Sequence, residues 1–499
     1  MTDTATPTGE AATDDGGLLD QLRALVGSEG PPTVSRHAVN EAMIAHWCDA
    51  MGDDNPLYLD EAFAAGTPVG GIVAPAAMLD VWDRGGLKHV RSADSPRGRA
   101  LALLEAAGFT SVVAVNSELE LRRYVRPGER LSNVEVLDAV SEEKATGLGV
   151  GHFVTTRHRY STEEGEHVGD LLFRVLKFKP GTGKQAPAPA EGAKPAPDPD
   201  PARRPRPATN LDNQFFWDGA RRRELRIQQC EGCGALHNPP TPRCPDCGSF
   251  DQGWIVASGR GHLYSFAVPQ YPQVNGFRYP VFVGLIELEE GPRLVSNVVG
   301  VTRDQLEVGM PLEITWLDSH PAQEEGALDA RGSITLPQFR PATAVPRGET
   351  LTADDVADGD VLPLSGVPVT PTLVVAGALA TRDFTEVHHD RDVAVNAGSK
   401  DIFMNINTTL GLTERYVTDW VGPGALVRAL RVRLGAPNYP GDTLTFSGSV
   451  PSADPATGEV SVALQGVNSL GAHVTGTVEL VLPGGTSYQA AASTPEVSS

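Results

Sequence analysis

Two stretches of the chain repeat the same order of hydrophobic and polar patterns. In the first stretch, apolar side chains recur four residues apart and predict a helix over 35–51: Val39, Met43, Trp47 and Met51. In the second, Thr370 followed by Pro371 is a typical helix start. Each helical segment precedes an Asp-containing loop and a second apolar helical segment. The shared order indicates that the two stretches are copies.

Long strands with alternating apolar and polar residues follow in both copies. In both, a turn of the form Pro-Gly-acid-x-Leu leads into a strand, at 127–131 and at 440–444. One long helix wrapped by a strongly bent antiparallel sheet would bury this pattern. We therefore predict the same α+β architecture for each copy.

Composition divides the chain between the copies. Pro and Ala alternate through 181–210 with almost no large apolar residue, which predicts an extended linker. A weaker break lies near 341–350. These breaks predict the following parts: a tail at 1–16, the first copy at 17–180, a helix and metal ribbon at 211–253, a small barrel at 254–345, the second copy at 346–485 and a tail at 486–499.

Four of the five cysteines form two Cys-x-x-Cys-Gly motifs, at Cys230, Cys233, Cys244 and Cys247. Their spacing predicts four thiolates around one tetrahedral ion. A structural Zn²⁺ is the leading interpretation, and rubredoxin-type iron is the alternative. Four thiolates leave no open coordination position, so we expect no metal catalysis. We expect His237, between the motifs, to be exposed and Cys48 to pack in the core.

Short strands with Gly-rich turns, from 254 to 316, predict a five-stranded barrel after the ribbon. An aromatic and basic helix at 215–223 precedes both. The combination resembles the zinc-ribbon/OB-fold family that accompanies thiolases and acyl-CoA enzymes. OB folds often bind nucleic acid, but we interpret the arginines at 221–223 as a solvated helix face or as a contact for CoA or a partner.

The net charge of the chain limits the classes of partner it can bind. It has 63 acidic against 41 basic residues, a formal net charge of −22, which repels nucleic acid and anionic membranes. No apolar run approaches the roughly 18 residues needed to cross a bilayer, and the N-terminus does not resemble a signal peptide. We expect a cytoplasmic protein without nucleic-acid or membrane partners.

The Asp loops of the two copies resemble a known signature. Residues 52–58 of the first copy read Gly-Asp-Asp-Asn-Pro-Leu-Tyr, with Ala64 six residues further on. This resembles the Gly-Asp-x-Asn-Pro-[Leu/Ile/Val]-His motif of MaoC-like, hydratase-2, hot-dog-fold (R)-specific enoyl-CoA hydratases. Residues 71–75 resemble the start of that family's central helix. The first copy has Tyr58 in place of the histidine, whereas the second keeps Asp383 and His388 and loses the Gly, Asn and Pro.

Chemistry assigns catalysis to the second copy. Hydration of a double bond conjugated to a thioester needs a base for water and a proton source for C2, and Asp383 and His388 sharing one water supply both. A tyrosine, with an ordinary pKa near 10, is a poor base at neutral pH. The first copy is therefore expected to be inactive, with Asp53 as a structural hydrogen-bonding residue and Tyr58 in the pocket wall. The alternative for the Asp-His pair is a helix-capping carboxylate beside a partly exposed histidine.

The thioester oxygen needs donors as it becomes an enolate. Backbone amides at the start of a helix are oriented for this, and in the second copy we expect those of Met404 and Asn405. The first copy is also longer, since Asp53 to Gly128 spans 75 residues and Asp383 to Gly441 spans 58. An interruption of its central helix after Trp82 would open a tunnel for a bulky, polycyclic acyl group. A plain surface insertion is the alternative.

Together the parts predict two hot-dog domains, a double hot dog, flanking a rubredoxin-like zinc ribbon and an OB-fold barrel. This order resembles actinobacterial steroid side-chain enoyl-CoA hydratases. The resemblance implies a steroid enoyl-CoA thioester as substrate, no redox cofactor, a homo-oligomer, and a thiolase-like, lipid-transfer-type aldolase docked on the ribbon and barrel for retro-aldol cleavage. The alternatives are a non-catalytic scaffold for such an aldolase, an (R)-specific hydratase or dehydratase for linear acyl-CoA, and a nucleic-acid-binding protein.

Overall fold

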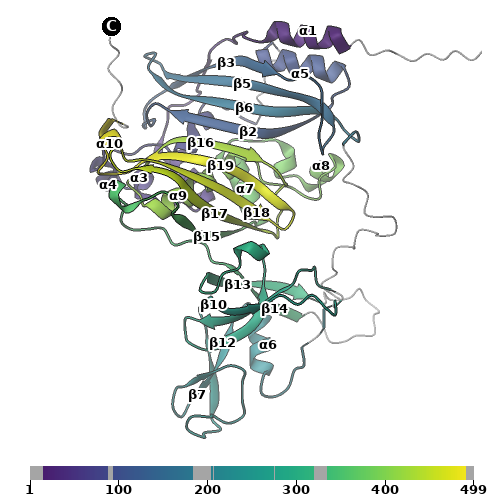
Figure 1. Cartoon of the computed structure of the whole chain (residues 1–499), viewed down its shortest axis with the longest axis vertical. Coiled ribbons are helices and arrows are strands. Elements are labelled where there is room, and N and C mark those ends of the chain that lie inside the picture. The colour runs from purple at the N-terminus through teal and green to yellow at the C-terminus, as the bar shows by residue number, and fades with distance from the viewer. Residues whose placement is uncertain are drawn as a thin grey trace, which may run out of the picture.

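The architecture of the chain is taken from a computed structural model. It describes residues 15–87, 94–183, 204–205, 207–274, 276–319 and 334–490. The two copies form one upper body, and the ribbon and barrel project from it below β15 (Figure 1). Most of the predicted 181–210 linker lies outside the described residues.

One continuous antiparallel sheet contains the strands of both copies. The first copy contributes β1 (Thr33–Val34), β2 (Ser111–Leu121), β3 (Leu131–Val140), β4 (Lys144–Ala145), β5 (Val150–Thr162) and β6 (His167–Lys179). The second contributes β15 (Val361–Pro368), β16 (Leu426–Leu434), β17 (Thr443–Asp454), β18 (Glu459–Asn468) and β19 (Gly471–Val481). The order is β1-β3-β5-β6-β2-β16-β19-β18-β17-β15, with β4 on β5.

The two copies meet where β2 pairs with β16, from Glu120 opposite Ala429 to Asn116 opposite Arg433. From this junction outward, the first copy runs β2-β6-β5-β3-β1 and the second runs β16-β19-β18-β17-β15, which is the same order of equivalent strands. One hydrophobic core cluster also spans both copies. The predicted double hot dog is therefore confirmed, and it forms within a single chain.

The central helices of the two copies differ in length. In the second copy, α9 (Ile406–Val421) is buried along nearly all of its 16 residues. Its counterpart in the first copy is a single 3₁₀ segment, η1 (Ala76–Val81). The chain then continues to α5 (Pro96–Ala106), which packs with α1 (Asp15–Leu25) beside β3 (Figure 1). The predicted interruption is present, whereas the tunnel it would open stays a prediction.

The remaining helices of the copies are short. They are α2 (Glu41–Met51), α3 (Pro56–Leu59), α4 (Glu61–Ala65), η4 (Ala353–Asp355), α7 (Pro371–Ala380), η5 (Glu386–His388), α8 (Arg391–Asn396) and α10 (Thr486–Ala490). Helix α2 was predicted to begin at residue 35 but begins at Glu41, because the Asn40 side chain caps it by accepting from the Met43 amide. Residues 486–490, expected as tail, instead form α10.

The lower body contains a ribbon and a closed barrel. Before and within the ribbon lie α6 (Gln214–Ala220), β7 (Arg226–Cys230), β8 (Leu236–His237) and β9 (Gln252–Val256). The barrel consists of β10 (Arg260–Ala267), β11 (Phe282–Leu288), β12 (Arg293–Val298), β13 (Pro311–Ser319) and β14 (Ile334–Pro341), with η3 (Arg303–Gln305) between strands. The predicted barrel is confirmed, but its first predicted strand, 254–256, belongs to the ribbon and β14 takes its place.

None of the helices in the described part of the chain combines the length and the hydropathy needed to cross a bilayer.

Candidate active site and metal centre

The loop after α7 brings Asp383 and His388 together. The chain leaves the helix through Arg382, which has the left-handed φ of 53°, and η5 then turns back so that His388 faces the carboxylate. His388 Nε2 lies 3.5 Å from Asp383 Oδ2. The histidine is 7% exposed. The structure thus brings together the two residues that the five-residue spacing predicts as a pair.

A backbone carbonyl fixes the orientation of the His388 ring. Nδ1 lies 2.7 Å from the carbonyl oxygen of Phe403, and the two rings meet edge to face. Because a carbonyl only accepts, Nδ1 bears the hydrogen of this bond. In the neutral imidazole Nε2 then keeps its lone pair, and this nitrogen is the one that faces Asp383. The ring is therefore oriented to accept a proton at Nε2.

The Asp383 carboxylate is held by several donors. Its Oδ1 accepts from the Thr385 hydroxyl at 2.7 Å, and its Oδ2 accepts from Asn405 Nδ2 at 3.2 Å. Arg84, from the first copy, lies 4.0 Å from Oδ2. Burial raises the pKa of Asp383, but the charges of Arg84 and His388 and the hydrogen bonds from Thr385 outweigh it and lower the pKa below its ordinary value. The group is therefore a carboxylate at neutral pH.

The start of α9 adjoins this pair. The Asn405 side chain caps the helix by accepting from the Thr408 amide at 2.8 Å. The Met404 amide donates to the carbonyl of Asn438 at 3.0 Å, so the prediction that it serves the thioester oxygen is wrong. For the backbone amide of Asn405 the role stays a prediction. The first amides inside the helix, of Ile406 and Asn407, have no acceptor within the helix itself.

The first copy shows how such an amide pair is used. From the Asp loop to the start of the central segment, residues of the second copy lie 330 positions after their counterparts, so that Ile406 and Asn407 correspond to Ala76 and Ala77. The amides of Ala76 and Ala77 both donate to the carboxylate of Glu414, at 2.9 and 2.8 Å. This amide geometry therefore holds two oxygens of an anion at the start of the central segment.

Glu414 closes the corresponding site of the first copy. It belongs to α9, is 1% exposed, and also accepts from the Tyr58 hydroxyl at 3.1 Å. Burial and the charge of Glu414 raise the pKa of Tyr58 well above its ordinary value. Tyr58 thus faces Glu414, and its place in the wall of an acyl pocket stays a prediction. Asp53 is 2% exposed and accepts a hydrogen bond from the Asn55 amide.

The charge of Glu414 should make stability depend on pH. Burial, opposed by the amides of Ala77 and Ala76, raises its pKa to about 7. A carboxyl whose pKa is raised on folding contributes stability that is present below its unfolded pKa and is lost as pH rises through 7. Between pH 5 and 8 the wild type should lose on the order of 2 kcal/mol more than Glu414→Gln. Urea unfolding of both proteins at the two pH values measures this, and equal losses would contradict it.

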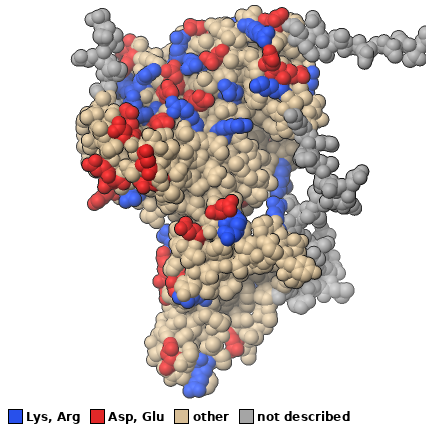
Figure 2. Space-filling view, in the orientation of Figure 1, with Lys and Arg blue, Asp and Glu red and all other residues tan. Residues whose placement is uncertain are grey.

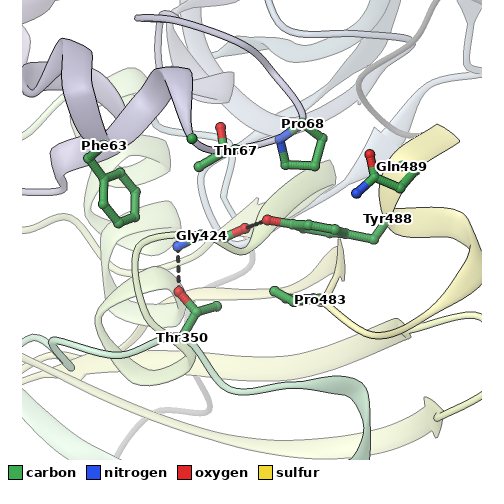
Figure 3. A pocket seen from close by; sticks show the side chains of 9 residues that line it. Phe63, Thr67, Pro68, Thr350, Gly424, Pro483, Tyr488 and Gln489 are labelled. Carbon is green, nitrogen blue, oxygen red and sulfur yellow. Dashed lines mark hydrogen bonds between the residues drawn. The ribbon is translucent and has the colours of Figure 1, made fainter.

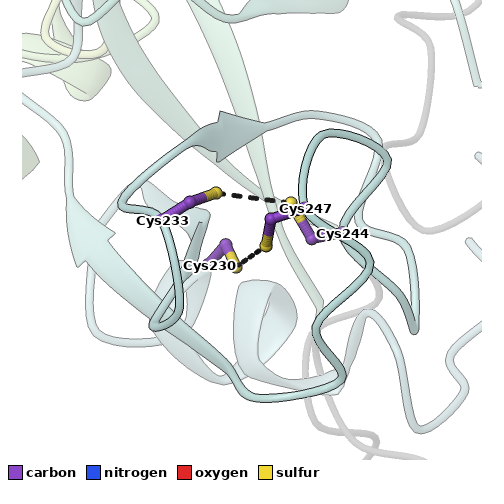
Figure 4. A group of neighbouring side chains, drawn as sticks. All are labelled: Cys230, Cys233, Cys244 and Cys247. Carbon is purple, nitrogen blue, oxygen red and sulfur yellow. Dashed lines mark hydrogen bonds between the residues drawn. The ribbon is translucent and has the colours of Figure 1, made fainter.

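The four predicted cysteines form one cluster in the ribbon (Figure 4). Sγ atoms of Cys230 and Cys247 lie 3.5 Å apart, those of Cys233 and Cys244 3.6 Å apart, and all four lie within 4.8 Å of one another. Metal–sulfur bonds of about 2.3 Å in a tetrahedron place sulfurs about 3.8 Å apart. The four thiolates fit a zinc ion.

Glycines and a histidine complete the metal centre. Gly234 and Gly248 follow the two motifs with φ of 79° and 80°, a conformation that a side chain would strain. His237 was expected to be exposed, but its side chain is only 15% exposed and Nε2 lies 3.4 Å from Cys244 Sγ. The histidine therefore packs against the sulfur cluster.

A surface hollow of about 390 Å³ lies away from both centres (Figure 3). Thr67 of the first copy and Tyr488 of α10 are on its wall. The Tyr488 hydroxyl donates to the carbonyl of Gly424 at 2.6 Å. None of the residues predicted for catalysis or metal binding lines this hollow.

Three family models match the chain. Residues 24–171 match "FAS1-like, dehydratase domain region". Residues 217–251 match "ChsH2, rubredoxin-like zinc ribbon domain", and residues 254–317 match "ChsH2, C-terminal OB-fold domain". The hot-dog fold, the dehydratase match and the zinc-ribbon match define a MaoC-like hydratase joined to a ChsH2-type module.

Curated relatives extend this identification. The chain is 41% identical over 334 residues to the "Probable enoyl-CoA hydratase alpha subunit" of Thermomonospora curvata, covering 66% of this chain and 98% of that protein. It is 39% identical over 302 residues to the 3-oxo-4,17-pregnadiene-20-carboxyl-CoA hydratase alpha subunit of Mycobacterium tuberculosis, covering 60% and 94%. It is also 56% identical over 122 residues to the beta subunit of that enzyme, covering 24% and 93%.

The chain belongs to the family of enoyl-CoA hydratase alpha subunits, and it is a hydratase. A solved structure, the ChsH1–ChsH2 complex of Mycobacterium tuberculosis, is 40% identical over 34% of this chain and 99% of that chain, with a TM-score of 0.31. Because the chain matches nearly all of an alpha and nearly all of a beta subunit, it combines both kinds of sequence in one polypeptide.

Proposed function

We propose that the chain hydrates a 2-enoyl-CoA thioester to the 3-hydroxyacyl-CoA at Asp383 and His388 in the second copy. The observation that carries the proposal is the facing of His388 Nε2 and the Asp383 carboxylate at 3.5 Å, beside the start of α9. A water that lies beside this contact can hydrogen-bond to both groups and so meets two bases at once.

The reaction then proceeds by addition across the double bond. His388 and Asp383 take one proton from the water as its oxygen bonds to C3, and the electron pair of the C2=C3 bond moves toward the thioester. The same pair returns the proton to C2, so that the product carries the hydroxyl group on C3 and the new hydrogen on C2. We infer that the amides of Ile406 and Asn407 bind the thioester oxygen, since their counterparts hold the Glu414 carboxylate at 2.8–2.9 Å.

We infer further that the acyl group is a bulky steroid side-chain thioester. The alpha and beta subunits that match the chain are named for hydration of a pregnadiene carboxyl-CoA. The shortened central segment of the first copy, six residues against sixteen in α9, supports room for a polycyclic group. A linear acyl-CoA is the competing substrate.

The ribbon and barrel are proposed to dock a thiolase-like aldolase that receives the product. Figure 2 shows few charged side chains on the visible face of this lower body. The four exposed aromatic side chains of the described chain all lie in it: Phe250, Trp254, Tyr264 and Tyr271. Exposed aromatic residues of this kind are enriched at protein interfaces.

A substrate panel tests the proposal. Purified protein is mixed with short, long linear and steroidal enoyl-CoA thioesters, and the loss of enoyl-thioester absorbance is followed. We expect the steroidal thioester to have the highest kcat/KM. Capture of an aldolase without turnover of any thioester would instead support the scaffold alternative.

A further inference from the structure

An arginine of the first copy reaches the candidate site of the second. Arg84 follows η1, and its Nη1 lies 4.0 Å from Asp383 Oδ2. Its other terminal nitrogen, Nη2, binds Asp80 Oδ2 at 2.6 Å. Asp80 in turn accepts from Asn407 at the start of α9 at 2.7 Å. The guanidinium is therefore held by a chain of contacts that ends on the helix adjoining the site.

A second arginine ties the same segment to the loop that presents Asp383. Arg382 Nε donates to the carbonyl oxygen of Arg84 at 3.2 Å. Arg382 has a φ of 53°, and its counterpart in the first copy is Gly52, with a φ of 63°. A side chain at this left-handed position costs roughly 1–2 kcal/mol relative to glycine. The second copy therefore keeps a strained arginine where glycine fits, and that arginine binds the first copy.

The two copies use one position in opposite ways. Counted from the aligned starts Ala76 and Ile406, Arg84 and Glu414 both lie eight positions further along the chain. Each reaches the site of the other copy: Glu414 fills the amide pair of the first, and Arg84 approaches the carboxylate of the second. A carboxylate thus occupies the site that lacks a histidine, and a guanidinium cation adjoins the site that has one.

We propose that Arg84 is a positioning residue of the hydration site, supplied by the otherwise inactive first copy and anchored there through Arg382. Its charge holds the Asp383 carboxylate aimed at the water shared with His388. This role rests on the hydration proposed above. It gives the first copy a direct part in the reaction of the second.

The charged groups around the pair define what a titration will report. Asp383 is faced by Arg84 and by His388. Arg84 is faced by Asp80, Asp383 and Asp83. Removing the guanidinium therefore takes from Asp383 its permanently charged positive neighbour, and its pKa should rise.

The test compares Arg84→Gln, Arg84→Lys and Arg382→Gly with the wild type. In Arg84→Gln, kcat should fall roughly tenfold with little change in KM, and the pKa of Asp383, from the ¹³C shift of its carboxyl, should rise. Arg84→Lys keeps a charge and should restore part of both. Arg382→Gly should lower kcat without loss of stability, since glycine fits the backbone there.

Arg123→Gln is the matched control. Arg123 is another buried arginine of the first copy, paired with Glu129 and Glu166. Its loss should lower the melting temperature but leave kcat and the Asp383 titration unchanged. An Arg84→Gln protein with wild-type kcat and wild-type Asp383 titration would overturn the proposal. If the wild type hydrates no enoyl-CoA, hydration itself fails, while the titration still decides whether Arg84 acts on Asp383.

Discussion

Replacing His388 with alanine should lower kcat/KM for enoyl-CoA hydration by roughly 10²- to 10⁴-fold, the range expected for loss of a general base. The imidazole is fixed by Phe403 through Nδ1 and faces Asp383 through Nε2, so no other orientation serves the water. Steady-state rates with the best thioester of the panel measure the change.

The neighbouring histidine is a matched control for this loss. His389 is exposed and adjacent in sequence, and His389→Ala should keep the wild-type rate. Circular dichroism should show that both variants fold. A His388→Ala protein that hydrates as fast as wild type would remove catalysis from this pair, whatever the other variants do.

Local spacing predicted the pair because local structure makes it. His388 lies five positions after Asp383, and one 3₁₀ turn brings the two residues close together. The cysteine motifs are predictable for the same reason. The two copies were visible in the sequence because each repeats its own turns and strand alternation.

The contacts between the two copies could not be predicted from local sequence spacing. Glu414 meets Ala76 and Ala77 across more than 330 positions, and Arg84 meets Asp383 across 299. Only the packing of one copy on the other creates these contacts. The signal in the sequence is the offset of 330 between the two Asp loops, which aligns Ala76 with Ile406. It does not reveal that the amides at this position bind an anion, because Glu414 reaches Ala76 only through packing.

The barrel shows a different limit. β14 (Ile334–Pro341) contains two prolines and was not predicted as a strand. It is held by pairing with β13 along eight residues and with β12 at two, so neighbours stabilise what its own sequence disfavours. The predicted strand at 254–256 instead pairs with β7 and forms the third strand of the ribbon sheet.

Cys244→Ser should remove the metal from the ribbon while leaving hydration intact. Cys244 is buried in the sulfur cluster, and a structural zinc site of this kind supplies on the order of 10–16 kcal/mol of binding energy that is also folding energy. Loss of one thiolate should reduce the zinc content, measured by mass spectrometry, from about one ion per chain toward zero. Strands β7 to β9 should then lose protection in hydrogen exchange.

The separation of the two centres makes this result informative. The ribbon lies at the far end of the lower body from the double hot dog that contains Asp383 (Figure 1). Hydration by Cys244→Ser should therefore stay near the wild-type rate, whereas aldolase binding should be lost if the ribbon is part of the docking surface. Cys48→Ala is the control, because Cys48 lies in the hot-dog core and should leave the zinc content unchanged. Stoichiometric zinc in Cys244→Ser would exclude the four-thiolate site, and iron with a thiolate absorption band would identify the rubredoxin-type alternative.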